Sequence, residues 1–364
     1  MYEWHYVHFI DELIRSGHTV IDCNPVNILG RLTTVAENSQ ILYDVAKKLS
    51  QSAGQHMLFA ALATDNNLDP SAIDGIRAMG IPCVNFSVDD VVAPYNVRGI
   101  GKKFDLHWTT FIGTEKTLID SYGCKVIYMP MAANPYFFKS TVARREHAMT
   151  FVGSQYGARG SYVELIAKTG VPIKVRGNGW GGHVSYVKNH PRSTLSSKLQ
   201  VIQEFVQSKN GRKILFGAMK NRIIPSKLTD ISFGNVDLAD GVSLVEMVQL
   251  YASSTVSLGV LEVGNTHTLR YPLFQYRLRE YETTMIGCAH IVRKTPELEN
   301  SFEEDKEIIF YSTKDELLDK VKFYLSPERY ELCLEIGKNA RKRAECEHTW
   351  LARFNVIWEK LGIN

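Results

Sequence analysis

The chain has 364 residues, of which 45% are hydrophobic and 22% are charged, and its formal net charge is +3. The composition is that of a folded globular protein, and the length favours two domains over a single core. So small a charge does not by itself indicate a nucleic-acid partner, and no run approaches the ~20 apolar residues that span a bilayer.

The six cysteines are scattered, and none belongs to a Cys-x-x-Cys pair. Cys288 and Cys346 each stand near a histidine, but neither has the second pair of ligands that a zinc site needs. The N-terminus is acidic and aromatic and has no apolar leader. We therefore expect reduced thiols in a cytoplasmic protein, rather than disulfides or zinc.

The N-terminal part alternates helical and strand patterns, which predicts a parallel sheet covered by helices. It opens on a helix over about residues 2–16 that Gly17 ends, before a first expected strand at 18–22. Helices are then expected at about 40–51, 72–79 and 115–122, and strands at 56–62, 83–87, 105–109 and 126–129. Because an α/β domain normally begins with a strand, either the first strand is missing or another element takes its place.

A polar, basic segment at 140–148 is predicted to link an N-terminal domain (1–139) to a C-terminal one (149–345). The second domain should contain strands at 149–152, 173–176 and 255–258, and helices at about 162–169, 244–251, 315–324 and 327–345. The last helix is expected at about 349–361, within a segment from 346 to 364.

A stretch at about 181–240 is predicted to be an insertion, with one helix at 195–207. Its second part is basic, with Lys209, Arg212, Lys213, Lys220, Arg222 and Lys227. It is either a solvated insertion or an element that binds an acceptor or a membrane surface.

The stretch from Arg279 to Cys288 carries the most chemical information. It predicts a helix that begins with Arg279 and Glu282, ends at Gly287 and leads into an apolar strand at 289–292. Such a pair suits a nucleotide-diphosphate sugar, because a carboxylate accepts both ribose hydroxyls and a guanidinium neutralises the diphosphate. The alternative is an ordinary surface ion pair at the start of a helix.

Glycines follow two of the expected strands. Gly153 and Ser154 precede Arg159 and a helix, so backbone N–H groups there could approach a phosphate, although a plain turn is the alternative. Gly177 closes the next strand, where the backbone must bend near a ligand or pack tightly. Trp180 either stacks on a base or belongs to the edge of the core.

Asp89 and Asp90 follow the strand at 83–87, and the carboxyl ends of parallel strands face the ligand crevice. One of them could orient an acceptor hydroxyl or act as a base, while the alternative is a loop or capping role. His107 falls within an expected strand, where a packing role is favoured over a catalytic one. No Asp-x-Asp motif is present, so we expect no metal.

Five short motifs occur in an order that resembles the CgeB-type (spore maturation protein) glycosyltransferase family. They are Phe151-Val-Gly-Ser154 with Arg159, Val175-Arg-Gly-Asn-Gly-Trp180, Arg279-x-Tyr-Glu282-x(4)-Gly287-Cys288, Glu307-Ile-Ile-Phe-Tyr311 and His348-Thr-Trp350. The resemblance covers the C-terminal half well and the N-terminal half loosely. It implies a GT-B fold, with two Rossmann-like domains facing a cleft and a last helix that returns to the N-terminal domain.

The resemblance also implies the chemistry: metal-independent, retaining transfer of a sugar from a nucleotide-diphosphate sugar, with UDP-sugar the expected donor and no further cofactor. Gly153, Arg159, Arg279 and Glu282 would bind the donor, and the acceptor is an unidentified glycan, protein or nucleic acid. One departure concerns the sugar contact, because Phe274 stands at the first position of the Glu-x(7)-Glu pattern of retaining families.

Three other readings stay open. The first is an epimerase or sugar-nucleotide hydrolase, which would turn over the donor without an acceptor. The second is a degenerate GT-B domain that serves as a scaffold. The third is a DNA-modifying glycosyltransferase that uses the basic residues at 209–227, which would bind duplex DNA with a steep salt dependence.

Overall fold

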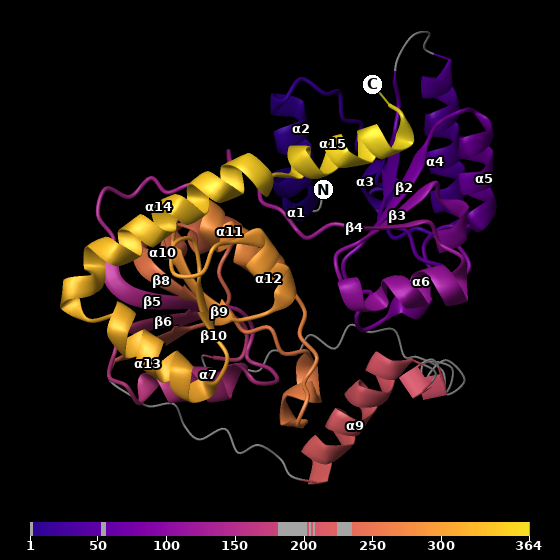
Figure 1. Cartoon of the computed structure of the whole chain (residues 1–364). Helices are drawn as coiled ribbons and strands as arrows, with labels where there is room; N and C mark the ends of the chain where they lie inside the picture. The colour runs from indigo at the N-terminus through magenta and orange to yellow at the C-terminus, as the bar shows by residue number, and fades with distance from the viewer. Residues whose placement is uncertain are drawn as a thin grey trace. The chain divides into compact units, whose positions relative to one another are not determined.

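A computed structural model describes residues 3–51, 56–180, 208–223 and 235–363, together with 202, 203, 205 and 206. The chain divides into two compact units. Unit 1 consists of Met1–Met131 and Trp350–Asn364, and unit 2 of Ala132–Thr349. Each unit contains a parallel sheet with helices packed against it (Figure 1).

Unit 1 has a four-stranded sheet in the order β1-β2-β3-β4. Its strands are β1 (Phe59–Ala61), β2 (Cys83–Ser87), β3 (Leu106–Thr109) and β4 (Val126–Tyr128). Its longer helices are α4 (Val35–Ser50), α5 (Pro70–Ala78), α6 (Glu115–Tyr122) and α15 (Trp350–Leu361). Short elements are α1 (Glu3–His5), η1 (Tyr6–Ile10), α2 (Asp11–Arg15), α3 (Pro25–Leu29), η2 (Pro94–Val97), η3 (Gly101–Lys103) and η4 (Ile112–Thr114).

The expected first helix is present as the consecutive elements α1, η1 and α2, and Gly17 follows them with φ 91°. The prediction of a strand at 18–22 is wrong, because these residues pair with no strand of the described sheet. Ile21 is 50% exposed, so the apolar residues of this segment are not buried against a neighbour. A β-rich composition favours a strand only where such a neighbour exists.

The two faces of this sheet are covered by different parts of the chain. Ala46 of α4, Ile73 of α5 and Leu118 of α6 form one core with Cys83. On the other face Phe86 lies opposite Trp108 in the β2–β3 register, and Phe9 and Trp350 pack on them. The first and the last helical segments of the chain therefore cover the same face.

Glu12 joins these two segments. Its buried carboxylate accepts hydrogen bonds from the backbone N–H groups of Trp350 (3.2 Å) and Leu351 (2.9 Å), at the start of α15. A carboxylate at this end satisfies N–H groups that have no partner within the helix and complements the helix dipole.

Unit 2 has a six-stranded sheet in the order β10-β9-β8-β5-β6-β7. Its strands are β5 (Glu146–Val152), β6 (Ile173–Arg176), β7 (Val236–Ala239), β8 (Ser254–Leu258), β9 (Ala289–Arg293) and β10 (Ile309–Tyr311). Its helices are α7 (Arg159–Ala167), α9 (Lys209–Ile223), α10 (Leu244–Ser253), α11 (Leu278–Ile286), α12 (Pro296–Ser301), α13 (Lys314–Tyr324) and α14 (Tyr330–Glu347), with the short η5 (Gly264–Thr268) and η6 (Pro327–Arg329).

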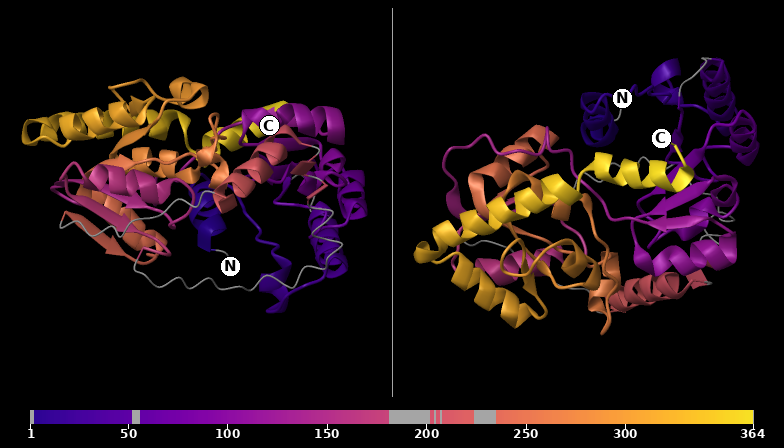
Figure 2. Two further views of the ribbon diagram at one scale, coloured as in Figure 1. Left: turned by 90° about the horizontal axis from the view of Figure 1, so that it is seen from below. Right: turned by 45° about the horizontal axis from the view of Figure 1, so that its top comes forward.

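Helices cover both faces of this sheet as well. Helices α7 and α13 lie on one face and α10, α11 and α14 on the other (Figures 1 and 2). Met149 and Phe151 of β5 pack with Tyr162 of α7 in the main core. The opposite face of the central strands carries Ser257 and His290, which are both fully buried.

Two expected boundaries need correction. The linker expected at 140–148 lies inside unit 2, and its last three residues belong to β5. Its basic character has a structural use, because the Arg145 guanidinium donates to the carbonyls of Tyr251, Ser254 and Ile286 at 2.9–3.0 Å. The insertion expected at 181–240 ends before β7, which pairs with β6 as an edge strand of the sheet. The helix expected at 195–207 lies largely outside the described residues.

Candidate functional site

The sheet of unit 2 has a topological switch point between β5 and β8. From β5 the chain proceeds through β6 to β7 on one side, and from β8 through β9 to β10 on the other. Ligands of open α/β sheets bind at the carboxyl ends of the strands at such a point. Gly153 and Ser154 follow β5 there, and α11 begins nearby.

The loop after β5 is held by close backbone contacts. The N–H of Gly153 donates to the carbonyl of Arg176 at 2.8 Å, and that of Gln155 to Asn178 at 2.8 Å. Gly177 has φ 146°, and a Cβ atom there would lie 2.3 Å from the carbonyl oxygen of Gly153. Gly177 therefore packs tightly against the Gly153 loop, which is one of the two roles considered for it.

Trp180 also packs against the Gly153 loop. Its indole N–H donates to the carbonyl of Gly153 at 2.7 Å, and its ring lies edge-on to Phe151. The side chain is 6% exposed. It is a residue of the core edge and holds the loop by a hydrogen bond.

Arg159 lies over this loop at the first position of α7. Its Nη1 atom donates to the carbonyl of Ser154 at 2.9 Å, and its guanidinium lies 4.1 Å from the centre of the Tyr156 ring. A Cβ atom on Gly153 would stand 3.0 Å from the same guanidinium, so the glycine makes room for the arginine. Burial lowers the pKa of Arg159 to about 10, which leaves it charged at neutral pH.

Arg277, the residue directly before α11, contacts the same aromatic ring. Its Nη1 atom donates to the Tyr156 hydroxyl at 2.8 Å. Its Nε atom is buried and has no hydrogen-bond partner among the described residues. In the sequence, Arg270 and Arg277 lie near Arg279 and could share the role of binding phosphate, and the structure places Arg277 at the capping position before α11.

Arg279 and Glu282 lie one turn apart on α11 and pair with each other. Nη1 of Arg279 is 2.7 Å from Oε2 of Glu282, and the same nitrogen contacts the Met247 sulfur. Glu282 is 3% exposed and Arg279 is 26% exposed. Burial opposes the charge of Arg279, but Glu282 and Tyr251 outweigh it, so the pKa of the guanidinium is raised.

Glu280 is a buried carboxylate that sequence analysis missed. It accepts the backbone N–H of Arg277 at 2.6 Å and thereby caps α11. Its second oxygen lies 4.0 Å from Nε2 of His290, whose Nδ1 is 2.8 Å from the Ser257 hydroxyl. Burial raises the pKa of Glu280 to about 7 and lowers that of His290 to about 3, so the histidine is neutral.

Together these elements form a cationic site. The guanidinium groups of Arg159 and Arg277 both lie against the Tyr156 ring, and Arg277 and Arg279 lower the pKa of Arg159 by charge repulsion. The N-termini of α7 and α11 add partial positive charge at the same edge. This arrangement suits a ligand with adjacent negative charges, such as a diphosphate.

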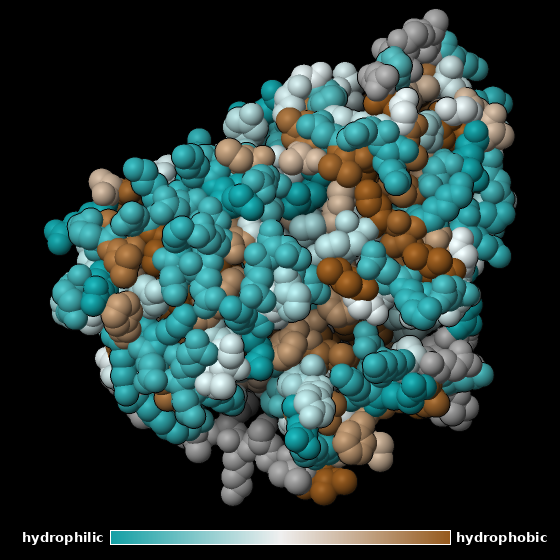
Figure 3. Space-filling view, in the orientation of Figure 1, coloured by the Kyte–Doolittle hydropathy of each residue, from teal (hydrophilic) through white to brown (hydrophobic). Residues whose placement is uncertain are grey.

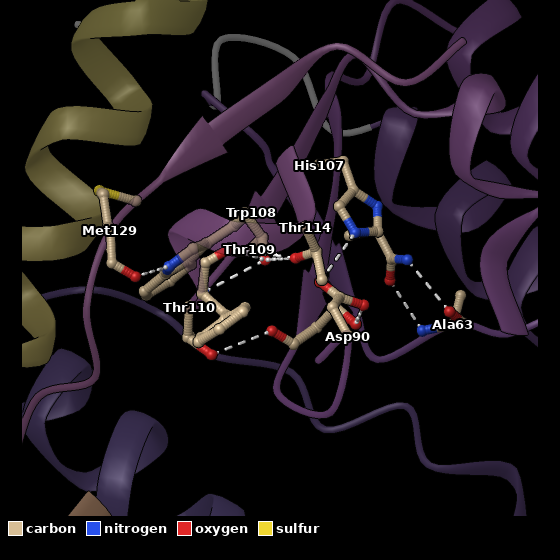
Figure 4. A network of polar contacts seen from close by, with 11 residues as sticks. Ala63, Asp90, His107, Trp108, Thr109, Thr110, Thr114 and Met129 are labelled. Carbon is tan, nitrogen blue, oxygen red and sulfur yellow. Dashed lines mark hydrogen bonds and ion pairs between the residues drawn. The ribbon is translucent and has the colours of Figure 1, made fainter. Parts of the chain in front are cut away.

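The two candidate aspartates of unit 1 lie in different environments. Asp90 is 3% exposed, accepts a hydrogen bond from the Ser87 hydroxyl and has Oδ2 3.7 Å from Nε2 of His107 (Figure 4). His107 is fully buried in β3, opposite Asn85, whose amide bonds to the backbone of Ala63. Asp89 is exposed. Of the two, Asp89 is therefore the one that a substrate can reach.

Three further features bear on the function: the cysteines, possible metal ligands and possible membrane-spanning helices. The six cysteines are free thiols. Within the described ranges no group of three His, Cys, Asp or Glu side chains could hold a metal ion. In the same ranges, no helix combines the length and the apolar character needed to cross a membrane.

Comparison with protein families identifies the chain. Residues 159–359 match the family described as glycosyl transferase-like, which is more than half of the sequence. The chain belongs to this family. It is thus an enzyme of the glycosyltransferase class, as the sequence predicted. No curated protein matches it.

Solved structures show the fold of this glycosyltransferase. A glycosyltransferase from Rickettsia africae ESF-5 is similar with a TM-score of 0.52 and 12% identity, covering 98% of this chain and 88% of that one. Anabaena Alr3699/HepE in complex with UDP-glucose is similar with a TM-score of 0.52 and 11% identity, covering 97% and 88%. The expected GT-B architecture, with parallel sheets in two α/β domains, is confirmed.

Proposed function

We propose that this glycosyltransferase transfers a sugar from a nucleotide-diphosphate sugar and that the cationic site of unit 2 binds the donor diphosphate. The observation that carries the proposal is that Arg159 and Arg277 share the Tyr156 ring, beside Arg279 of α11 and the N-termini of α7 and α11. The buried Nε of Arg277 supports it, because this donor has no acceptor among the described residues and so favours a ligand that accepts from it.

Each group has a role in the transfer. The loop at Gly153 and Ser154 brings backbone N–H groups to the phosphates. The arginines stabilise the negative charge that gathers on the diphosphate as the sugar leaves, which lowers the barrier because this charge is greatest in the transition state. The same positive charge makes a divalent metal unnecessary.

Glu282 would accept the ribose hydroxyls of the donor. Because Glu282 and Arg279 are bonded to each other, the donor must share or replace their ion pair: the ribose takes the carboxylate and the diphosphate takes the guanidinium. On donor binding, Arg279 and Glu282 would thereby exchange their contact with each other for contacts with the donor.

Finer assignments belong to the same proposal. The order of the five motifs supports a CgeB-like subfamily and, with it, a retaining reaction in the cytoplasm. UDP is the preferred nucleotide, since the similar Anabaena protein was solved with UDP-glucose. Asp89 is the candidate residue for orienting an acceptor hydroxyl, and a screen of glycan, protein and nucleic-acid acceptors would identify the acceptor.

Thermal unfolding with UDP, GDP, CMP, dTDP and their sugars tests the proposal. A nucleotide at about one hundred times its Kd adds roughly 2.7 kcal/mol to the free energy of unfolding, which is a clear shift in Tm. Arg159→Gln and Arg277→Gln should each remove the shift. Arg176→Gln is the matched control, because Arg176 ends β6 and pairs with Asp237 instead. Folded protein that shifts with no nucleotide would overturn the donor assignment.

A further inference from the structure

Helix α9 carries a surface that the donor site does not use. In the sequence it contains five Lys or Arg residues and no Asp or Glu, in the order KNGRKILFGAMKNRI. Three large apolar side chains stand exposed along it. A helix with both features needs an explanation other than packing against its own domain.

One face of α9 is anchored to η5. A Cβ atom on Gly217 would lie 2.7 Å from the carbonyl oxygen of Asn265, so the helix backbone rests directly on this segment. The ammonium groups of Lys220 and Lys213 donate to the carbonyls of Thr268 and Tyr271. The apolar stems of these lysines therefore lie along the contact and their charges end on backbone oxygens.

The other face is apolar and unanchored. Phe216 and Met219 are each 63% exposed and Ile223 is 78% exposed. Their spacing of three and four residues places them on one stripe of the helix. Tyr271, 66% exposed, adds an apolar side chain from the segment that Lys213 contacts. In Figure 3, brown surface adjoins teal side chains at the lower edge of the view, where Figure 1 draws α9.

Exposed cations flank this stripe. They are Lys209, Arg212 and Arg222 of α9, and Arg270, whose guanidinium lies 5.3 Å from the Tyr271 ring. The sequence has no Asp or Glu from 205 to 223 or from 264 to 272. The surface thus combines an apolar centre with a rim of one charge sign.

We infer that this α9 surface, made of Phe216, Met219, Ile223 and Tyr271 with their flanking cations, docks on an anionic lipid bilayer. An interfacial helix places apolar side chains at the boundary of headgroups and acyl chains, while Lys and Arg meet anionic headgroups. A nucleic acid would use the cations but leave the apolar stripe in water. The charge complementarity and the stripe together favour the bilayer.

The inference does not depend on the donor assignment, because α9 residues contribute nothing to the cationic site. Each cation near an anionic membrane strengthens binding by about fivefold, and salt weakens this electrostatic contribution. The apolar stripe contributes binding free energy through burial in the bilayer, and salt does not weaken this contribution. Binding should therefore need both the anionic lipid and the stripe.

Co-sedimentation of the full chain with vesicles tests this docking. We expect binding to phosphatidylcholine vesicles that contain phosphatidylglycerol, and at least about tenfold weaker binding to phosphatidylcholine alone. Raising the salt should reduce the binding. Equal binding to both vesicles, or binding to neither, would overturn the inference. Capture of duplex DNA without vesicle binding would overturn it in favour of a nucleic-acid surface.

Two comparisons of variants distinguish the α9 surface from other exposed parts of unit 2. The double variant Phe216→Ser with Ile223→Ser should abolish vesicle binding. The double variant Phe323→Ser with Val245→Ser should bind normally. It is the matched control, because Phe323 and Val245 are also exposed apolar residues of unit 2, at 44% and 49%. Lys209→Glu with Arg222→Glu should weaken binding at least tenfold, and the exposed Lys322→Glu on α13 should not. Because all of these side chains are exposed, the variants should fold. Test variants that bind like the controls would rule the surface out.

Discussion

The guanidinium of Arg279 lies 2.7 Å from the carboxylate of Glu282, and the two side chains form an ion pair three residues apart on α11. From the sequence, the two residues are expected to bind different parts of one ligand, the guanidinium the diphosphate and the carboxylate the ribose. Their pairing means that the stability of α11 and the binding of a donor depend on the same two side chains. Effects on folding and on binding must therefore be measured together.

A double-mutant cycle on Arg279→Gln and Glu282→Gln measures this pairing. Each single change should lower the free energy of unfolding by about 1–3 kcal/mol, because it leaves a largely buried partner without its counter-charge. The double variant should lose less than the sum. Urea unfolding gives the values. Additive losses would show that the pair contributes no coupling, and nucleotide titration of the same variants reports the donor site separately.

Glu280→Gln tests the effect of burial on a carboxylate. The pKa of Glu280 is raised from 4.5 to about 7, so between these pH values only the unfolded chain ionises and stability falls as the pH rises. The variant should be more stable than the wild type above pH 7 by up to roughly 3 kcal/mol. Chemical unfolding at a series of pH values checks this. Glu335→Gln, at an exposed position on α14, should leave the profile unchanged.

His290→Asn tests the opposite slope. Burial depresses the pKa of His290 from 6.5 to about 3, so its contribution is complete above pH 6.5 and is lost as the pH falls toward 3. From about pH 6.5 to 4.5 the Glu280 and His290 slopes oppose each other and largely cancel. His290→Asn should expose the Glu280 slope, with stability rising as the pH falls through this window. A profile as flat as the wild type would contradict this balance.

Gly177→Ala tests the close approach under the donor loop. The new Cβ atom would meet the carbonyl of Gly153 at 2.3 Å in a left-handed backbone with φ 146°. Gly170→Ala is the control, since Gly170 has φ 80° and nothing within 4 Å of the added atom. Gly177→Ala should cost about 1–3 kcal/mol more than the control. Equal costs in urea unfolding would show that the backbone conformation alone matters at this position.

Glu12→Ala tests the carboxylate that caps α15. Removing it leaves the N–H groups of Trp350 and Leu351 without this acceptor, which should lower the free energy of unfolding by about 1–2 kcal/mol. Glu359→Ala changes an exposed glutamate near the other end of the same helix and should have little effect. A similar loss in both variants would argue against a specific role for the cap.

Much of the fold could be predicted because local pattern and burial agree in parallel sheets. The strand at 83–87 matches β2, and the helix that ends at Gly287 matches α11 and its left-handed glycine with φ 77°. The apolar residues at 18–22 failed as a strand because periodicity reports which residues can be buried and not which neighbour exists. The edge strand β7 was hidden for the same reason, inside a segment that looked like an insertion.

The candidate site was predicted by residue type and only partly by geometry. The loop at Gly153, Arg159 and α11 come together at one sheet edge, as expected from their positions after strands. Sequence could not show that Asp90 is buried against Ser87, since adjacent aspartates look alike in a pattern. It also missed Glu280, because a carboxylate next to an arginine and two residues before another glutamate gives no sign of burial.

The sheet of unit 1 owes one of its faces to α15, which holds Trp350 against Phe86 and Trp108. This helix leaves the ribosome only after every residue of unit 2 has been made. Phe86 and Trp108 therefore lack Trp350 as a packing partner while the later sheet is made, and of the two helical segments on this face only the one with Phe9 is then available. Unit 1 therefore receives its last packing helix only after all the residues of unit 2 have been made.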